Sequence, residues 1–271
     1  MNVKTSIFAL TLLSAFLASA APIVKNGDRI GFLGDSITQF GNNGAGYVNL
    51  VIKGLEVAGV KAEKVPAGIS GNKSPQMLAR VKGHVLSKDV QFMTLSCGVN
   101  DVWHGKNGVE LEDYKKNISQ ILDRAAEANV KVIVLTSTMI TEDEKGANNL
   151  KLDKYNDWLR EEAARRNLPL ADLNADMKAE LRRIRETDKT PGNKLTRDGV
   201  HMAFPGDCMM AWGVLRALGV EESQKDAIYA AWNDFPGAYQ VLVSLSANEQ
   251  KKLQALGKRA DEIVRDAINA K

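Results

Sequence analysis

The sequence predicts an α/β fold in which helices cover both faces of a parallel β-sheet. Short apolar runs alternate along the chain with segments whose apolar residues recur at helical spacing. The runs at 90–95 (VQFMTL) and 130–135 (VKVIVL) are almost continuously apolar, which is typical of strands buried on both faces. Because strand-like and helical segments alternate, the strands are expected to be parallel and joined by helical crossovers.

Five strands are predicted from the apolar runs, at residues 29–33, 61–65, 90–95, 130–135 and 168–173. Helices are predicted between and after them, at residues 47–58, 75–86, 111–128, 150–166, 175–185 and 204–218. In the first of these helices, Val48, Val51 and Leu55 fall on one face, which is expected to meet the sheet.

The start of the chain has the pattern of a secretory signal peptide. Lys4 precedes an apolar run at 7–17, and the small residues Ala18, Ser19 and Ala20 follow it. We therefore expect export, to the periplasm or the medium, after cleavage near Ala20. An uncleaved membrane anchor is the less favoured interpretation, because the apolar run is short for a bilayer span.

The end of the chain differs from the strand–helix alternation. Residues 221–271 are predicted to form a helical extension that packs on a domain at 21–220. Ser246 and Glu249 have the spacing of a capping box, and an apolar stripe continues from Leu253 to Ala267. A helix that binds a partner protein is the alternative interpretation.

Composition and charge exclude several classes of function. The formal net charge is +3 and no long basic block occurs, so nucleic-acid binding is not expected. Cys97 and Cys208 are interpreted as two buried thiols, although a bridge between them stays open. His84, His104 and His201 are too few and too scattered to suggest a metal site, and none is expected.

Four short motifs follow predicted strands. They are Gly34-Asp35-Ser36, Ser70-Gly71-Asn72, Gly98-Val99-Asn100-Asp101 and Asp198-Gly199-Val200-His201. Each motif by itself is compatible with an ordinary turn or helix cap. Ligands bind at the carboxyl ends of the strands in a parallel α/β sheet, so these distant segments are expected to converge on one edge.

Together these residues supply the parts of a serine hydrolase. Ser36 is the candidate nucleophile, and a serine hydroxyl needs a base to take its proton. His201 is the candidate base, and Asp198, three residues earlier, can orient its ring. The tetrahedral oxyanion needs fixed donors, for which the N–H groups of Ser36 and Gly71 and the side-chain amide of Asn100 are suitable.

The four motifs resemble the conserved blocks of the SGNH hydrolases, also called GDSL-type esterases. The serine block reads Gly-Asp-Ser with Ile37 where the family usually has Leu, and all blocks occur in the family order within residues 30–218. The resemblance implies a three-layer α/β/α flavodoxin-like sandwich. It also implies hydrolysis of carboxylic esters by Ser36, His201 and Asp198 without a cofactor.

Export and the resemblance together favour a short-acyl esterase that acts on O-acetyl groups of carbohydrate. A lysophospholipase or thioesterase, an acyltransferase to sugars, and a non-catalytic carbohydrate-binding protein on the same fold are the alternatives. Asp35, Asp101, Trp103 and His104 are candidate substrate-binding residues, although such residues also stabilise turns or pack in loops. The expected partner is a small-molecule or carbohydrate ester, with neither nucleic acid nor a stable membrane anchor.

Overall fold

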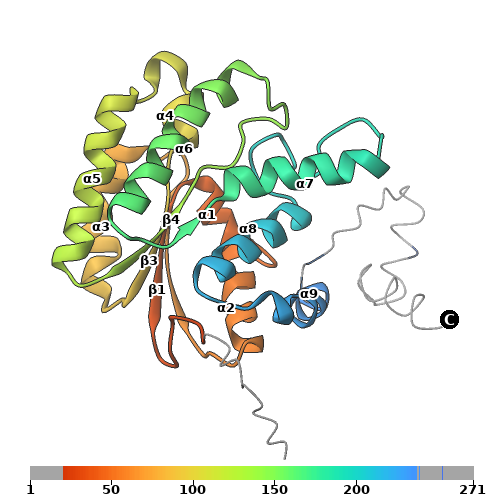
Figure 1. Ribbon diagram of the computed structural model, residues 1–271, viewed down its shortest axis with the longest axis horizontal. Coiled ribbons are helices and arrows are strands. Elements are labelled where there is room, and N and C mark those ends of the chain that lie inside the picture. Colours follow the sequence, from red (N-terminus) through yellow and green to blue (C-terminus); the bar gives the residue numbers. More distant parts are fainter. Residues whose placement is uncertain (1–20, 237, 239–251, 253–271) are drawn as a thin grey trace, which may run out of the picture. The chain divides into compact units, whose positions relative to one another are not determined.

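A five-stranded parallel sheet forms the middle layer of the fold (Figure 1). The computed structural model describes residues 21–236, 238 and 252. The strands are β1 (Arg29–Gly34), β2 (Glu63–Gly68), β3 (Phe92–Ser96), β4 (Lys131–Leu135) and β5 (Leu170–Ala171). Their spatial order is β2-β1-β3-β4-β5, so the chain adds strands first on one side of β1 and then on the other.

Helices flank the sheet on both faces (Figure 1). The α-helices are α1 (Ser36–Gly41), α2 (Tyr47–Val57), α3 (Ser74–His84), α4 (Val99–Trp103), α5 (Leu111–Glu127), α6 (Ala147–Arg165), α7 (Leu173–Thr187), α8 (Phe204–Ala217) and α9 (Lys225–Asn233). Single 3₁₀ turns form η1 (Leu86–Lys88), η2 (Gly105–Asn107) and η3 (Glu222–Gln224). On one face α3 packs against α5, and on the other α2 packs against α8.

The predicted three-layer α/β/α fold with a five-stranded parallel sheet is confirmed. Every residue of β3 is buried, as its apolar run indicates. The fifth strand, predicted at 168–173, is shorter, because the Asp172 side chain accepts a hydrogen bond from the Ala175 amide and begins α7. The second strand lies at 63–68 instead of 61–65.

Two short helices, α1 and α4, were not predicted. Each begins within two or three residues of the end of a strand and spans fewer than two turns, which is too short for apolar periodicity to reveal it. These helices carry Ser36 and Asn100 at the carboxyl edge of the sheet.

The chain divides by its contacts into Met1–Ala238 and Tyr239–Lys271. In the first unit α9 packs on α2, and the fully buried Trp232 donates from Nε1 to the Leu50 carbonyl at 2.8 Å. The predicted signal peptide at 1–20, and the capping box and apolar stripe within 246–267, lie outside the described residues. Within the described part, no helix is long and apolar enough to cross a membrane. Cys97 and Cys208 are both buried and free, as favoured from the sequence.

Candidate active site

Ser36 stands at the first turn of α1, directly beyond β1. Asp35 caps this helix, because its Oδ1 accepts a hydrogen bond from the Ile37 amide at 2.9 Å. Gly34 ends the strand where only glycine fits, since a Cβ there would lie 2.0 Å from the Thr38 hydroxyl oxygen. The tight strand-to-helix turn therefore presents Ser36 at the edge of the sheet with its backbone fixed from both sides.

The α7–α8 loop (residues 188–203) brings Asp198 and His201 to Ser36. His201 Nε2 lies 2.9 Å from Ser36 Oγ, and His201 Nδ1 lies 2.7 Å from Asp198 Oδ2. The serine and the histidine are 165 residues apart in the chain. A base in this position can take the hydroxyl proton of Ser36 while the carboxylate fixes the ring.

The Asp198 carboxylate is held by the backbone of its own turn. Its Oδ1 accepts from the amides of Val200 at 3.0 Å and His201 at 2.8 Å. Partial burial raises the pKa of Asp198, but the hydrogen bonds from the His201 ring and from these amides lower it to about 2. The group is therefore an anion at any pH near neutrality, as the partner of a histidine ring must be.

The expected oxyanion donors lie at the ends of β2 and β3. Asn100, only 5% exposed, donates from Nδ2 to the Asn72 carbonyl at 3.1 Å and more weakly to Asp35 Oδ2 at 3.3 Å. Gly71 follows β2 with φ of +75° and open space where a Cβ would be. Its neighbour Ser70 donates twice to Gln39 of α1, at 2.7 and 2.8 Å, which ties the glycine motif to the helix that begins at Ser36.

The candidate carboxylates Asp35 and Asp101 are buried beneath the site. Asp35 is 2% exposed, and burial raises its pKa to about 6 against the opposing hydrogen bond from Ile37. Asp101 is fully buried and accepts from the Ser74 amide at 2.9 Å, and burial likewise raises its pKa. Asp35 thus supports the turn at Ser36, and Asp101 ties the helix that carries Asn100 to the start of α3.

The candidate residues Trp103 and His104 lie at the end of α4. Trp103 is 45% exposed, whereas His104 Nε2 lies 3.1 Å from Asn100 Oδ1. On the histidine side of Ser36, Phe40 is 46% exposed, and its ring meets the His201 ring edge-on at 5.0 Å between centroids. Exposed rings thus adjoin both His201 and the Asn100 turn.

Comparison with known families agrees with this geometry. Residues 32–206 match the model of the GDSL-like Lipase/Acylhydrolase family, which is more than half of the chain. The chain belongs to this family. The match begins in β1 and ends in α8, so it spans Ser36, Asn100 and His201.

Relatives of known structure carry the same fold. An acetylxylan esterase from Geobacillus stearothermophilus is 24% identical over 73% of this chain and 97% of its own length. The crystal structure of another acetyl xylan esterase is 31% identical, with a TM-score of 0.64, and covers 70% of this chain and 98% of its own. A structure of the Geobacillus enzyme superposes with a TM-score of 0.65 at 25% identity, over 73% of this chain and 97% of its own. Family and relatives together make this GDSL-type protein a serine ester hydrolase.

Arg80 of α3 is a supporting residue that the sequence did not reveal. Its guanidinium donates to Asn72 Oδ1 and to the carbonyls of Ala67 and Gly34, each at 2.7 Å. One side chain therefore fixes the ends of β1 and β2 and the glycine motif together. No motif marks this position, because an arginine on an amphipathic helix is ordinary.

Glu142 is a second supporting residue without a sequence signal. Its Oε1 accepts from the amides of Leu195 and Thr196 and from the Thr196 hydroxyl, each at 2.8 Å. Its Oε2 accepts from the Lys194 amide at 2.7 Å. This buried carboxylate thus fixes the α7–α8 loop shortly before Asp198.

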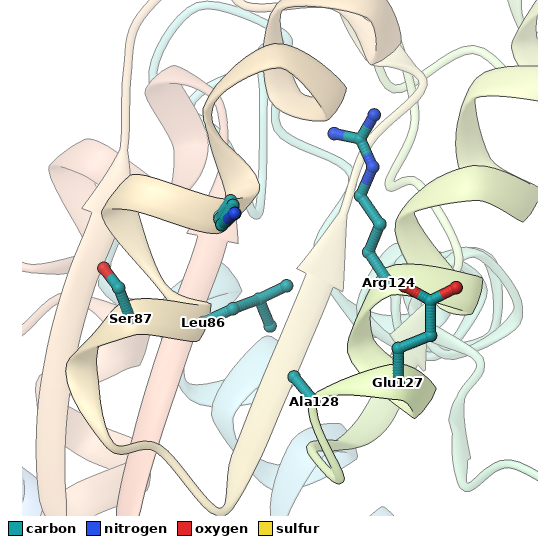
Figure 2. A pocket seen from close by; sticks show the side chains of 6 residues that line it. Leu86, Ser87, Arg124, Glu127 and Ala128 are labelled. Atoms are coloured by element: carbon teal, nitrogen blue, oxygen red, sulfur yellow. The ribbon is translucent and has the colours of Figure 1, made fainter.

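A cavity of about 600 Å³ opens at a different place, between α3, η1 and α5 (Figure 2). It is lined by Lys82, Leu86, Ser87, Arg124, Glu127 and Ala128. These residues precede β3 and β4 and so lie toward the amino ends of the strands, opposite the edge that carries the GDSL-type motifs. Among residues 21–236, 238 and 252, no group of three or more His, Cys, Asp or Glu residues is placed to hold a metal ion.

Proposed function

We propose that this GDSL-type enzyme removes O-acetyl groups from carbohydrate through an acyl-enzyme formed on Ser36. The observation that carries the proposal is the line of hydrogen bonds from Asp198 through His201 to the Ser36 hydroxyl. The substrate class is supported by relatives that are named acetylxylan esterases and that this chain covers almost completely.

The reaction divides into two similar steps. His201 Nε2 takes the hydroxyl proton as Ser36 Oγ bonds to the acetyl carbonyl carbon, and the electron pair of the C=O bond moves to oxygen. The Asn100 amide and the N–H groups of Ser36 and Gly71 stabilise that oxyanion. The intermediate collapses, and the sugar oxygen leaves with the proton from His201. Water then attacks the acetyl-enzyme by the same route and releases acetate.

Exposed apolar side chains on the segments that carry the candidate site residues suit a sugar substrate. Phe40 beside His201, Trp103 after Asn100 and Ile69 after β2 are 46%, 45% and 37% exposed. An aromatic ring buries a large apolar area when a ligand packs on its face, and the C–H face of a sugar ring is such a ligand surface. We assign these side chains to the contact with the carbohydrate.

Export belongs to the same proposal. It rests on the signal-peptide pattern of residues 1–20 and fits a polymeric substrate, which an enzyme meets outside the cell. Fractionation of producing cells and N-terminal sequencing of the active protein test it. A mature start near Ala21 supports export, and an active cytoplasmic protein that begins at Met1 contradicts it.

The test of function compares ester hydrolysis by the wild type, Ser36→Ala and the control Ser87→Ala, which alters an exposed serine of η1. Substrates are p-nitrophenyl esters of increasing acyl length and acetylated xylo-oligosaccharides. We expect kcat to fall on the order of 10⁴-fold or more in Ser36→Ala. Turnover should decline as the acyl chain lengthens. Enzyme recovered from an acid-quenched reaction should carry one acetyl group on the peptide that contains Ser36.

Three outcomes contradict the proposal. Unchanged turnover by Ser36→Ala shows that Ser36 is not the nucleophile. Hydrolysis that favours long acyl chains indicates a lysophospholipase or thioesterase. Binding of the oligosaccharide without hydrolysis indicates a carbohydrate-binding protein on the same fold.

A further inference from the structure

His104 faces Asn100 across one turn of chain. Asn100 is the second residue of α4, and His104 follows the helix four positions later, a spacing that places two side chains on one helix face. His104 Nε2 and Asn100 Oδ1 lie 3.1 Å apart. The contact therefore joins a candidate oxyanion donor to the residue directly after α4.

The partners of Asn100 fix which atom of its amide faces which neighbour. Nδ2 faces two acceptors, the Asn72 carbonyl and Asp35 Oδ2, so the amide oxygen faces His104. An amide oxygen accepts hydrogen bonds and cannot donate them. His104 Nε2 must therefore carry the hydrogen, and the ring donates to Asn100.

We propose that His104 is a positioning residue that holds and polarises the Asn100 amide for the oxyanion. The proposal rests on the proposed function, in which Asn100 Nδ2 exchanges its weaker contact, at 3.3 Å to Asp35 Oδ2, for the oxyanion. A hydrogen bond accepted at the amide oxygen strengthens the N–H groups at the other end of the same amide, because chains of hydrogen bonds polarise one another. It also satisfies an oxygen of a side chain that is only 5% exposed.

This role differs from the substrate contact expected from the sequence. His104 and Trp103 are both exposed, but Nε2 of His104 is engaged by Asn100, whereas no such polar contact occupies the Trp103 ring among the described residues. The two adjacent residues are thus assigned separate tasks: Trp103 faces the substrate, and His104 acts through Asn100.

A matched pair of variants tests the proposal. Gln and Met have similar length and shape, but only Gln carries a nitrogen donor at the position of Nε2. We expect His104→Met to lower kcat about tenfold, the effect of one lost hydrogen bond, and to leave KM within about twofold. The loss should fall on kcat because oxyanion contacts form only in the transition state. His104→Gln should keep kcat within about threefold of the wild type.

A double-mutant cycle separates positioning from general support of the fold. In an Asn100→Ala background, His104→Met should cost nothing further, since its effect passes through the missing amide. Equal kcat values for the Met and Gln variants overturn the proposal, as does a full additional loss in the double variant. If Asn100→Ala itself leaves kcat unchanged, the oxyanion role in the proposed function fails instead.

Discussion

At the scale of single residues, Asp207 is a buried acid that links α8 to the region of the nucleophile. It is 5% exposed, and its Oδ1 accepts from the Tyr47 amide at the start of α2 at 2.9 Å. The Tyr47 hydroxyl in turn lies 2.8 Å from the Thr38 hydroxyl, two residues beyond Ser36. Burial raises the pKa of Asp207 to about 7, against the opposing effects of the Tyr47 amide and Arg197.

This raised pKa makes stability depend on pH. The folded state disfavours the Asp207 anion, whereas the unfolded chain accepts it. The contribution of Asp207 to the free energy of unfolding is therefore fully present below about pH 4 and is lost as pH rises toward 7. Asp207→Asn stays neutral and can still accept from Tyr47. We expect the variant to gain on the wild type with rising pH, by up to about 4 kcal/mol, since one pKa unit is worth about 1.4 kcal/mol.

Urea unfolding of both proteins between about pH 4 and 8 measures this difference. The matched control is Asp113→Asn, an exposed aspartate of α5. This control separates the loss of any aspartate from the loss of a buried one. A flat difference for Asp207→Asn over the same range contradicts the buried-anion account.

At the scale of elements, the α7–α8 loop owes its shape to the segment that follows β4. Glu142 accepts four hydrogen bonds from residues 194–196. Next to it the Thr141 amide donates to the Gly199 carbonyl at 2.7 Å. Thr141 has φ of +64°, a backbone conformation that β-branched residues rarely adopt, and the surrounding contacts hold it there. The segment after β4 thus fixes the loop at residues 194–196, just before Asp198, and again at Gly199, between Asp198 and His201.

Removal of the Glu142 carboxylate should therefore disturb catalysis from a distance. Misplacing a reacting group by about 1 Å can cost about 100-fold in rate, so we expect Glu142→Ala to lower kcat/KM about 10- to 100-fold. Glu142→Gln keeps an oxygen for the donors at Leu195 and Thr196 and should lose less. The control is Glu144→Ala. Glu144 lies on the same segment as Glu142, and its replacement removes an ion pair with Arg182 of α7. A loss as large in Glu144→Ala places the effect in the segment as a whole and contradicts the role of Glu142.

At the scale of the whole molecule, α9 belongs to the packing of the hydrolase fold although it follows the matched family region. Ile228 and Trp232 are fully buried, and the Trp232 ring lies 4.8 Å from that of Tyr229. Gly54 lets α8 and α9 approach α2 closely, since a Cβ there would lie 2.4 Å from Leu215 and 3.4 Å from Ile228. Helices α2, α8 and α9 therefore share one apolar interface.

Truncation of Trp232 should be costly for stability. We expect Trp232→Ala to lower the free energy of unfolding by about 3–5 kcal/mol, the usual loss for a large aromatic removed from a core. Trp232→Phe keeps most of the ring but loses the donor to Leu50, and should cost less than half as much. Chemical unfolding of the three proteins measures the series. Near-equal stability of Trp232→Ala and the wild type contradicts the assignment of α9 to the core.

The sheet, the main helices and the candidate site motifs could be predicted from the sequence, because each depends on a local pattern of residues. Apolar runs and helical spacing predict the sheet and its main helices, and the four motifs at strand ends predict which residues gather at one edge. The structure places Ser36, His201 and Asp198 in a hydrogen-bonded line as that reasoning expects. The sequence did not predict the short helices α1 and α4 or the exact ends of β2 and β5, because short elements carry little periodicity.

The contacts that hold those residues in place become visible only in the folded chain. Glu142 meets its partners 52 to 54 residues along the chain, and Arg80 reaches Gly34 across 46. Glutamate and arginine are ordinary on exposed surfaces, so their residue types indicate nothing until folding brings the partners near. Local patterns in the sequence were enough to predict the chemical groups of the site and the fold that brings them together. The long-range hydrogen bonds that set their geometry depend on contacts that no local pattern records.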